Sequence, residues 1–191
     1  MARLSSAYNV EHHQHRGGRA CSGALWPRGA IEHYGVLRAY LTRHGAGPLP
    51  THDEALDELL PERHNHPEGW QGRFRRGHPD AVLLRYALET VGNLSGLLLS
   101  HLDVFQRGVT LNWCESYSTT ASPGVERIPP GGAQDLEHQS TLTKLLMDAW
   151  PQYAMPPIDS AVAFLEGIAG ITSLPVVLGS YGATYADVHE K

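Results

Sequence analysis

The chain has 191 residues and a mass of 20.9 kDa, which is long enough for one domain with a hydrophobic core. Hydrophobic residues make up 41% of it and charged residues 18%, as in soluble globular proteins. The 20 acidic and 15 basic residues leave a net charge of −5, which argues against a general nucleic-acid binder. Any anion binding must therefore be local.

The cysteines and lysines exclude further classes of protein. Cys21 and Cys114 are too few for a disulfide framework or a Cys-rich zinc site, so a reducing cytoplasm is the expected compartment. Neither Lys144 nor Lys191 lies in a Gly-rich Walker pattern, so the sequence carries no phosphate loop of its own. No apolar run approaches the roughly 18 to 20 residues of a membrane span, and the N-terminus has no signal-peptide core. We expect no membrane partner.

Residues 1–30 are polar and show neither a helical nor a strand period, which predicts a poorly ordered arm. An alternative is metal binding by His12, His13 and His15, since neutral imidazoles suit zinc or nickel. Adjacent histidines without a supporting carboxylate or cysteine are weak support for it.

Regular patterns begin at Ile31. The apolar segment 31–41 leads into a loop over 42–48, which contains glycines and a proline. In the segment 51–54, Thr51 and Glu54 have the spacing of a capping box, which predicts a short helix ended by Pro61.

An arginine-rich segment follows. Two glycines leave room for backbone to approach a ligand, and three guanidiniums stand within four positions, at Arg73, Arg75 and Arg76. Because a guanidinium matches phosphate or carboxylate oxygens two at a time, Arg73 and Arg75 are predicted to hold two anionic groups. The alternative is a solvated basic turn. The full predicted binding segment is Gly69, Trp70, Gln71, Gly72, Arg73, Phe74 and Arg75.

The next elements predict a sheet with helices. Asp80 can cap a helix whose apolar residues recur at helical spacing and which stops at Gly92. The apolar run 95–100 is typical of a strand buried on both faces. The exit from this strand, His101 to Asp103, is where open α/β sheets place ligand groups.

The remaining segments complete the pattern. Alternating residues over 109–114 predict a half-buried strand, and the Pro-, Gly- and Ser-rich stretch 118–139 predicts a loop. A helix capped by Asp159 precedes a strand at 175–178, which ends in Gly179-Ser180-Tyr181-Gly182. The apparent elements run helix, strand, helix, strand, strand, helix, strand, which predicts the α/β class.

Asp103 offers a route to base selectivity. A carboxylate just beyond a buried strand can accept two parallel hydrogen bonds from the N1–H and exocyclic amine of a guanine, which adenine cannot reproduce. The small residues Ser180 and Gly182 would let backbone approach the same base. Taken alone, Asp103 also fits a helix cap or a turn.

From about Ile31 to the C-terminus the chain resembles the C-terminal half of adenylosuccinate synthetase. The resemblance rests on five segments that occur in one order: Leu37 to Pro48, Gly72 to Arg75, Ser95-Gly96, Leu102 to Val104 and Ser180 to Gly182. It implies the C-terminal portion of that fold, with a mixed sheet and flanking helices.

The family joins aspartate to inosine monophosphate with GTP and Mg²⁺, in purine nucleotide biosynthesis. The resemblance implies that residues 69–75 bind aspartate, that Arg73 also reaches the inosine nucleotide, and that Arg75 lies on the GTP side. The guanine of GTP would lie at His101, Leu102 and Asp103, together with Ser180, Tyr181 and Gly182.

Two departures from the family pattern leave the substrate open. His101 stands where the family commonly has Lys, and an imidazole cannot lay a long alkyl stem across a purine. Trp70-Gln71-Gly72 replaces the common Thr-Thr-Gly. This variant is similar to phage-type relatives that act on deoxyguanylate to make 2-aminoadenylosuccinate.

The largest departure is an absence. The resemblance implies that the family's N-terminal half carries the phosphate loop, the Asp that acts as base and magnesium ligand, and the His that acts as general acid. Residues 1–30 match none of them, so we expect a truncated chain that is a poor catalyst or none. The alternatives are a non-catalytic nucleotide-binding module, or a remnant. The expected protein partner is a second copy of this chain, in a homodimer, or a polypeptide that supplies the N-terminal half.

Overall fold

The computed structural model describes residues 32–62, 65 and 70–190. The expected N-terminal arm, its histidines and Gly69 lie outside the described residues. The strands are β1 (Tyr34–Arg38), β2 (Leu41–His44), β3 (Phe74–Gly77), β4 (Gly96–Ser100), β5 (Cys114–Ser118), β6 (Trp150–Tyr153), β7 (Val176–Ser180) and β8 (Val188–Glu190). The helices are α1 (Glu54–Leu59), α2 (Ala81–Val91), α3 (Asp103–Gln106), α4 (Leu136–Met147), α5 (Ala161–Thr172) and the 3₁₀ turn η1 (Tyr185–Asp187).

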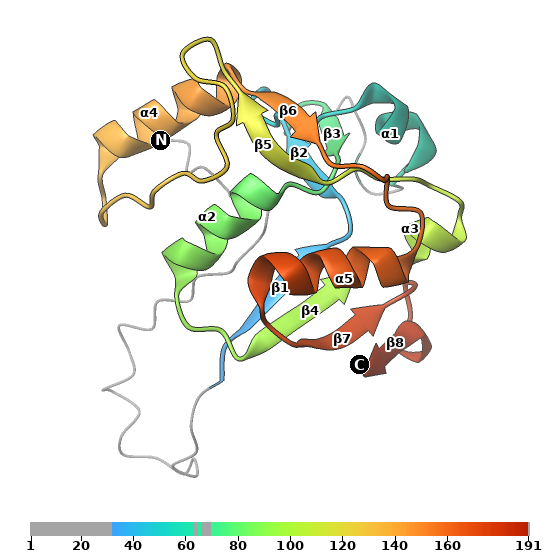
Figure 1. Cartoon of the computed structure of the whole chain (residues 1–191). Coiled ribbons are helices and arrows are strands. Elements are labelled where there is room, and N and C mark those ends of the chain that lie inside the picture. Colours follow the sequence, from blue (N-terminus) through green and yellow to red (C-terminus); the bar gives the residue numbers. More distant parts are fainter. Residues whose placement is uncertain (1–31, 63–64, 66–69, 191) are drawn as a thin grey trace.

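The main sheet has the strand order β1-β4-β7-β8 (Figure 1). β1, β4 and β7 are parallel, and β8 is antiparallel to β7. Two antiparallel pairs, β2-β3 and β5-β6, lie beyond its upper end in Figure 1. The predicted α/β class, with a mixed sheet and flanking helices, is confirmed.

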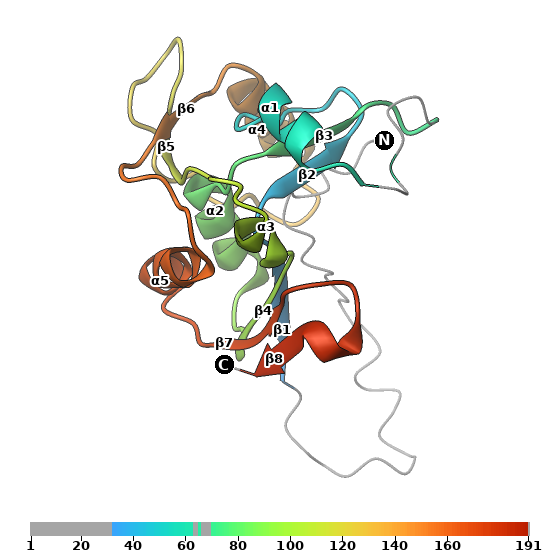
Figure 2. The same cartoon turned by 90° about the vertical axis from the view of Figure 1, so that its right-hand side faces the viewer.

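One face of the main sheet forms the core. Leu37, Leu97 and Leu99 are buried there with Leu84 of α2 and Phe164 of α5. Both helices lie on this side of the sheet in the two views (Figures 1 and 2). Leu98 alternates with Leu97 and Leu99 and is only partly buried, so the described elements bury one face of β4 more fully than the other, whereas its continuous apolar run predicts burial on both.

The sequence locates α2 and α5 correctly. The Asp80 carboxylate accepts a hydrogen bond from the Leu83 N–H (3.0 Å), and Gly92 ends α2 with a positive φ of 81°. The cap predicted at Asp159 is wrong by one residue. Ser160 is the N-cap of α5, because its extended backbone lets its hydroxyl accept from the Ala163 N–H (3.2 Å).

The capping box predicted at Thr51 is also wrong. Asp53 caps α1 by accepting from the Ala55 N–H, whereas the buried Thr51 hydroxyl donates to the carbonyl of His78 (2.8 Å). Thr51 therefore joins the loop before α1 to the end of β3. A long-range partner decides its role, which local spacing does not reveal.

The strand predicted over 109–114 begins only at Cys114. Val109, Leu111 and Trp113 do point inward, as their alternation predicts, but Leu111 makes one isolated bridge, to Ile158, instead of a ladder. The loop predicted over 118–139 is likewise too long, because α4 begins at Leu136 with Asp135 as its N-cap. In the described part of the segment 31–41, β1 spans Tyr34–Arg38 and β2 begins at Leu41.

Candidate functional site

The arginine-rich segment lies in the β2-β3 pair. In the antiparallel register Arg75 is opposite Arg43 and Arg76 is opposite Thr42. Arg73 precedes β3, and its half-exposed guanidinium forms ion pairs with Asp57 (2.9 Å) and with Glu54 (3.5 Å). Both acids come from α1, so this helix orients the first arginine.

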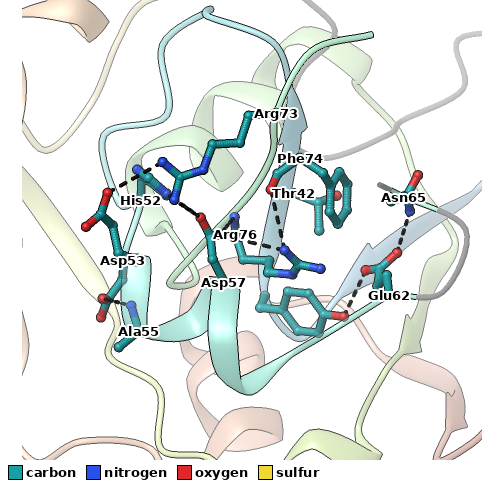
Figure 3. A network of polar contacts seen from close by, with 12 residues as sticks. Thr42, His52, Asp53, Ala55, Asp57, Glu62, Asn65, Arg73, Phe74 and Arg76 are labelled. Carbon is teal, nitrogen blue, oxygen red and sulfur yellow. Dashed lines mark hydrogen bonds and ion pairs between the residues drawn. The ribbon is translucent and has the colours of Figure 1, made fainter. Parts of the chain in front are cut away.

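Asp57 is the centre of a network of polar contacts (Figure 3). Its carboxylate accepts from Arg73 and from the backbone N–H of Arg76 (2.7 Å), and it pairs with His52 (3.0 Å). Burial raises the pKa of Asp57, but the contacts with His52, Arg76 and Arg73 outweigh burial and hold the pKa below its usual range. Asp57 therefore stays ionised and fixes Arg73.

Arg75 is held by backbone instead of by a carboxylate. Its Nη2 donates to the carbonyl of Gly45 (2.6 Å) and to that of Gly47. Gly45 and Gly72 both have positive φ, and a Cβ on Gly72 would lie 3.0 Å from the Cα of Gly45. Gly72 is therefore needed where two stretches of backbone approach each other.

The second predicted group lies at the ends of β4 and β7. The N–H of Leu102 donates to the carbonyl of Ser180 (3.0 Å), which brings the two predicted base-binding segments together. Asp103 opens α3, and its partly exposed carboxylate pairs with Arg107 at 3.9 Å. The Ser180 hydroxyl donates to the carbonyl of Gly182 (2.9 Å).

Tyr181 and Gly182 lie in the turn that η1 closes. The N–H of Tyr181 donates to the carbonyl of Asp187 (2.9 Å). A Cβ on Gly182 would lie 2.6 Å from the Asp187 carboxylate, so a glycine is required for space. This turn therefore holds a fixed shape beside Ser180.

Arg38 links the β2-β3 pair to the second group. Its Nη1 donates to Thr42 of β2 (3.4 Å) and to Glu62 (3.0 Å), and its Nη2 lies 3.1 Å from His101. Glu62 also accepts from Tyr40 (3.1 Å). No pattern in the sequence indicates this role of Arg38, although Arg38 lies in the segment 37–48 that carries the resemblance.

A cavity of about 690 Å³ opens beside Arg75, between the loop 46–53 and the β6 region. His78 lies in its lining, pairs with Asp53 (3.1 Å) and accepts from the N–H of Asn112 (3.3 Å). Burial lowers the pKa of His78 despite the Asp53 carboxylate, so the ring is neutral at pH 7. No signal in the sequence indicated this pair.

Within residues 32–62, 65 and 70–190, no cluster of His, Cys, Asp and Glu side chains could hold a metal ion. No helix in these ranges is both long and apolar enough to span a membrane.

The comparisons with known proteins agree with this architecture. The family model for adenylosuccinate synthetase matches residues 10–187, so the match begins before Ile31. Similar curated relatives are the adenylosuccinate synthetases of Alkalilimnicola ehrlichii, 32% identical over 183 residues, and Syntrophotalea carbinolica, 34% identical over 185. These alignments cover 87% and 86% of this chain, and 39% of each relative.

A solved structure, that of the fully ligated adenylosuccinate synthetase from Plasmodium falciparum, shares the fold with a TM-score of 0.61 at 18% identity. The match covers 83% of this chain and 39% of that one. The chain thus spans about two fifths of the length of these relatives. Since the family model matches nearly the whole sequence, the chain belongs to the adenylosuccinate synthetase family.

Proposed function

We propose that this chain supplies the aspartate-binding and guanine-binding loops of a GTP-dependent ligase that joins aspartate to inosine monophosphate. The observation that carries the proposal is the hydrogen bond between Leu102 and Ser180, because it joins the two segments that would hold the guanine. His101 and Asp103 flank Leu102, and Tyr181 and Gly182 follow Ser180 directly.

The chemistry of Asp103 supports guanine over adenine. An ionised carboxylate only accepts hydrogen bonds, and guanine offers two donors on one edge whereas adenine presents an acceptor at N1. The Asp103 carboxylate is about a third exposed, so it can reach a ligand. Ser180 is small enough for a base to lie beside it, whereas the Asp187 carboxylate takes the space next to Gly182.

Arg73 and the adjoining loop would bind aspartate. Half of the Arg73 side chain is exposed, and Asp57 holds its position, so a substrate carboxylate can be bound at little cost in ordering the guanidinium. Its contribution to the reaction would be orientation and electrostatic stabilisation. The residues 70–72 would complete the loop, as would Phe74 through its packing on Arg76.

Phosphoryl transfer also needs a phosphate loop, Mg²⁺ and an acid-base pair. The described residues contain no set of metal ligands and do not fit Mg²⁺. In this proposal those groups come from a different segment or polypeptide, and deoxyguanylate is the alternative to inosine monophosphate as substrate.

Isothermal titration of the full chain with GTP and ATP tests the base site. We expect GTP to bind more tightly than ATP. Asp103→Asn should lower the affinity for GTP by about tenfold or more, because a charge-assisted pair of hydrogen bonds is lost. Asp135→Asn, at an exposed helix cap, is the matched control. Equal binding of GTP and ATP would contradict the proposal.

Activity requires a separate assay. Adenylosuccinate formation would be followed with the chain at micromolar concentration, GTP, Mg²⁺, aspartate and inosine monophosphate, with deoxyguanylate in a parallel reaction. We expect no turnover from the isolated chain, and turnover when a polypeptide carrying the remaining family segments is added.

A second candidate function is a complementing module without activity of its own, and the face of the main sheet that no described helix or strand covers favours it. Tyr34 and Val36 of β1 are 40% and 49% exposed and alternate along the strand with the buried Gly35 and Leu37. The helices α2 and α5 lie on one side of the sheet (Figure 2). Parallel strands are normally covered on both faces. Among the described strands β1 pairs only with β4, so no described strand occupies its other edge.

Co-expression with the N-terminal part of a curated relative tests this second candidate. We expect a stable complex that Val36→Asp disrupts. Val162→Asp is the control, because Val162 is an exposed valine of α5. Equal loss of the complex in both variants would rule out this face as the docking surface.

A further inference from the structure

Two arginines converge on Gly47. Arg75 donates to the Gly47 carbonyl. From the neighbouring strand, the Arg43 guanidinium lies so close that a Cβ on Gly47 would be 1.9 Å from Nη2 and 2.3 Å from Cζ. Gly47 does not have a positive φ, so this position needs glycine to make space for Arg43 and not for backbone conformation.

These two guanidiniums differ from their neighbours in lacking a carboxylate. Arg38 forms an ion pair with Glu62. Arg73 pairs with Glu54 and Asp57, and Arg76 also pairs with Asp57. Over the described ranges, neither Arg43 nor Arg75 has an ion pair with an acid, and the Nε of each is buried without a hydrogen-bond partner.

Electrostatics make this arrangement unfavourable without a counter-ion. Burial lowers the pKa of both Arg43 and Arg75, and the charge of Arg43 lowers that of Arg75 further, while Asp57 opposes the shift only in part. Two partly desolvated like charges cost free energy, which an anion between them would offset.

We propose that Arg43 and Arg75 together bind one oxyanion group, a phosphate or a carboxylate, at the Gly45–Gly47 turn. Arg75 Nη2 is engaged by two carbonyls and its Nε is buried, which leaves Nη1 for the ligand, and the terminal nitrogens of Arg43 supply the second set of donors. Arg75 also lines the cavity of about 690 Å³, so the rest of the ligand has space. The inference deepens the proposed function by adding Arg43 to its binding site, and it rests on that function for the ligand's identity.

The test uses inorganic phosphate and pyrophosphate as probes, with aspartate as the carboxylate. Thermal unfolding of the full chain is followed as each probe is added at constant ionic strength. Because a ligand that binds the folded state raises Tm by mass action, we expect both the parent and Arg85→Gln to gain stability. Arg85 is the matched control: it donates to the carbonyls of Glu115 and Glu126 and also lacks an ion pair with an acid among the described residues.

Arg43→Gln should reduce the affinity for the phosphate probe at least tenfold, and Arg43→Lys should restore part of it. Gly47→Ala keeps both charges but displaces the guanidinium at the end of the flexible Arg43 side chain. It should therefore also lower the affinity for the anion without unfolding the protein. A purely structural role of Arg43 would lower Tm by the same amount with and without the probe.

Unchanged probe affinity in Arg43→Gln, or no probe binding by the parent, would overturn the inference. The proposed function is tested separately by GTP binding and Asp103→Asn. If GTP binds through Asp103 while the affinity for the anion is unchanged in Arg43→Gln, only the inference is wrong. If anions need Arg43 while GTP does not bind, only the proposed function is wrong.

Discussion

The guanidinium of Arg38 lies 3.1 Å from Nε2 of His101. A guanidinium can only donate, so Nε2 must accept, and the neutral ring carries its proton on Nδ1, 3.1 Å from the hydroxyl of Ser100. Burial lowers the pKa of His101, and the charge of Arg38 lowers it further. The contact thus fixes the orientation, tautomer and charge of a residue at the proposed base site.

Arg38→Met should therefore raise the pKa of His101 toward or above its ordinary value of 6.5. NMR titration of the ring measures this directly. Because the unfolded chain binds this proton more readily, His101 makes stability fall as pH is lowered through about 6.5, and the fall should be smaller in the variant. Arg127→Met, which breaks a pair with Glu89 on α2, is the control, and an unchanged His101 pKa would contradict the expectation.

Asp80 should produce a pH dependence of the opposite sign. Burial raises its pKa to about 6 although the Tyr117 hydroxyl donates to it (2.5 Å). The folded chain then binds a proton that the unfolded chain does not, so this residue adds stability as pH falls from 7 to 5, by about 1 kcal/mol.

Asp80→Asn keeps a competent cap for α2 but cannot titrate. Chemical unfolding of both proteins at pH 7 and pH 5 should show the extra stabilisation only in the parent. Asp135→Asn, at the exposed cap of α4, should behave like the parent. The same change with pH in Asp80→Asn would show that Asp80 is not the titrating group.

Gly77→Ala should destabilise the fold by about 1 to 3 kcal/mol, as over-packing of a rigid site does. A Cβ there would lie 2.7 Å from the Thr51 hydroxyl and 2.8 Å from its carbonyl oxygen, and backbone cannot move aside cheaply. Urea unfolding measures the loss. Gly132→Ala, where nothing lies within 4 Å of the added Cβ, should change stability little, and equal losses would contradict this account.

Arg73→Met separates binding from folding. Its ion pairs are half exposed, so stability should change by less than about 1 kcal/mol. Aspartate affinity should fall about tenfold, because the guanidinium binds the substrate carboxylate in the proposed site. Calorimetry with aspartate gives the binding result. A stable variant that binds aspartate normally would remove Arg73 from the site.

The sequence alone determined the features that depend on neighbouring residues. Helical spacing and a capping carboxylate located α2, and a continuous apolar run located β4, because period and capping act within a few residues of the chain. Segments of family-like sequence in one order also identified the family. The same segments predict loops at 101–103 and 180–182, whereas Asp103 begins α3 and Ser180 ends β7.

Only the tertiary structure decided what depends on distant partners. Thr51 has the spacing of a cap but hydrogen-bonds His78, and Leu111 alternates like a strand residue but lacks a ladder. The pairing of Arg38 with His101, and the convergence of Arg43 and Arg75 on Gly47, join segments far apart in the chain. Their geometry follows from strand order and register, which local propensity does not specify.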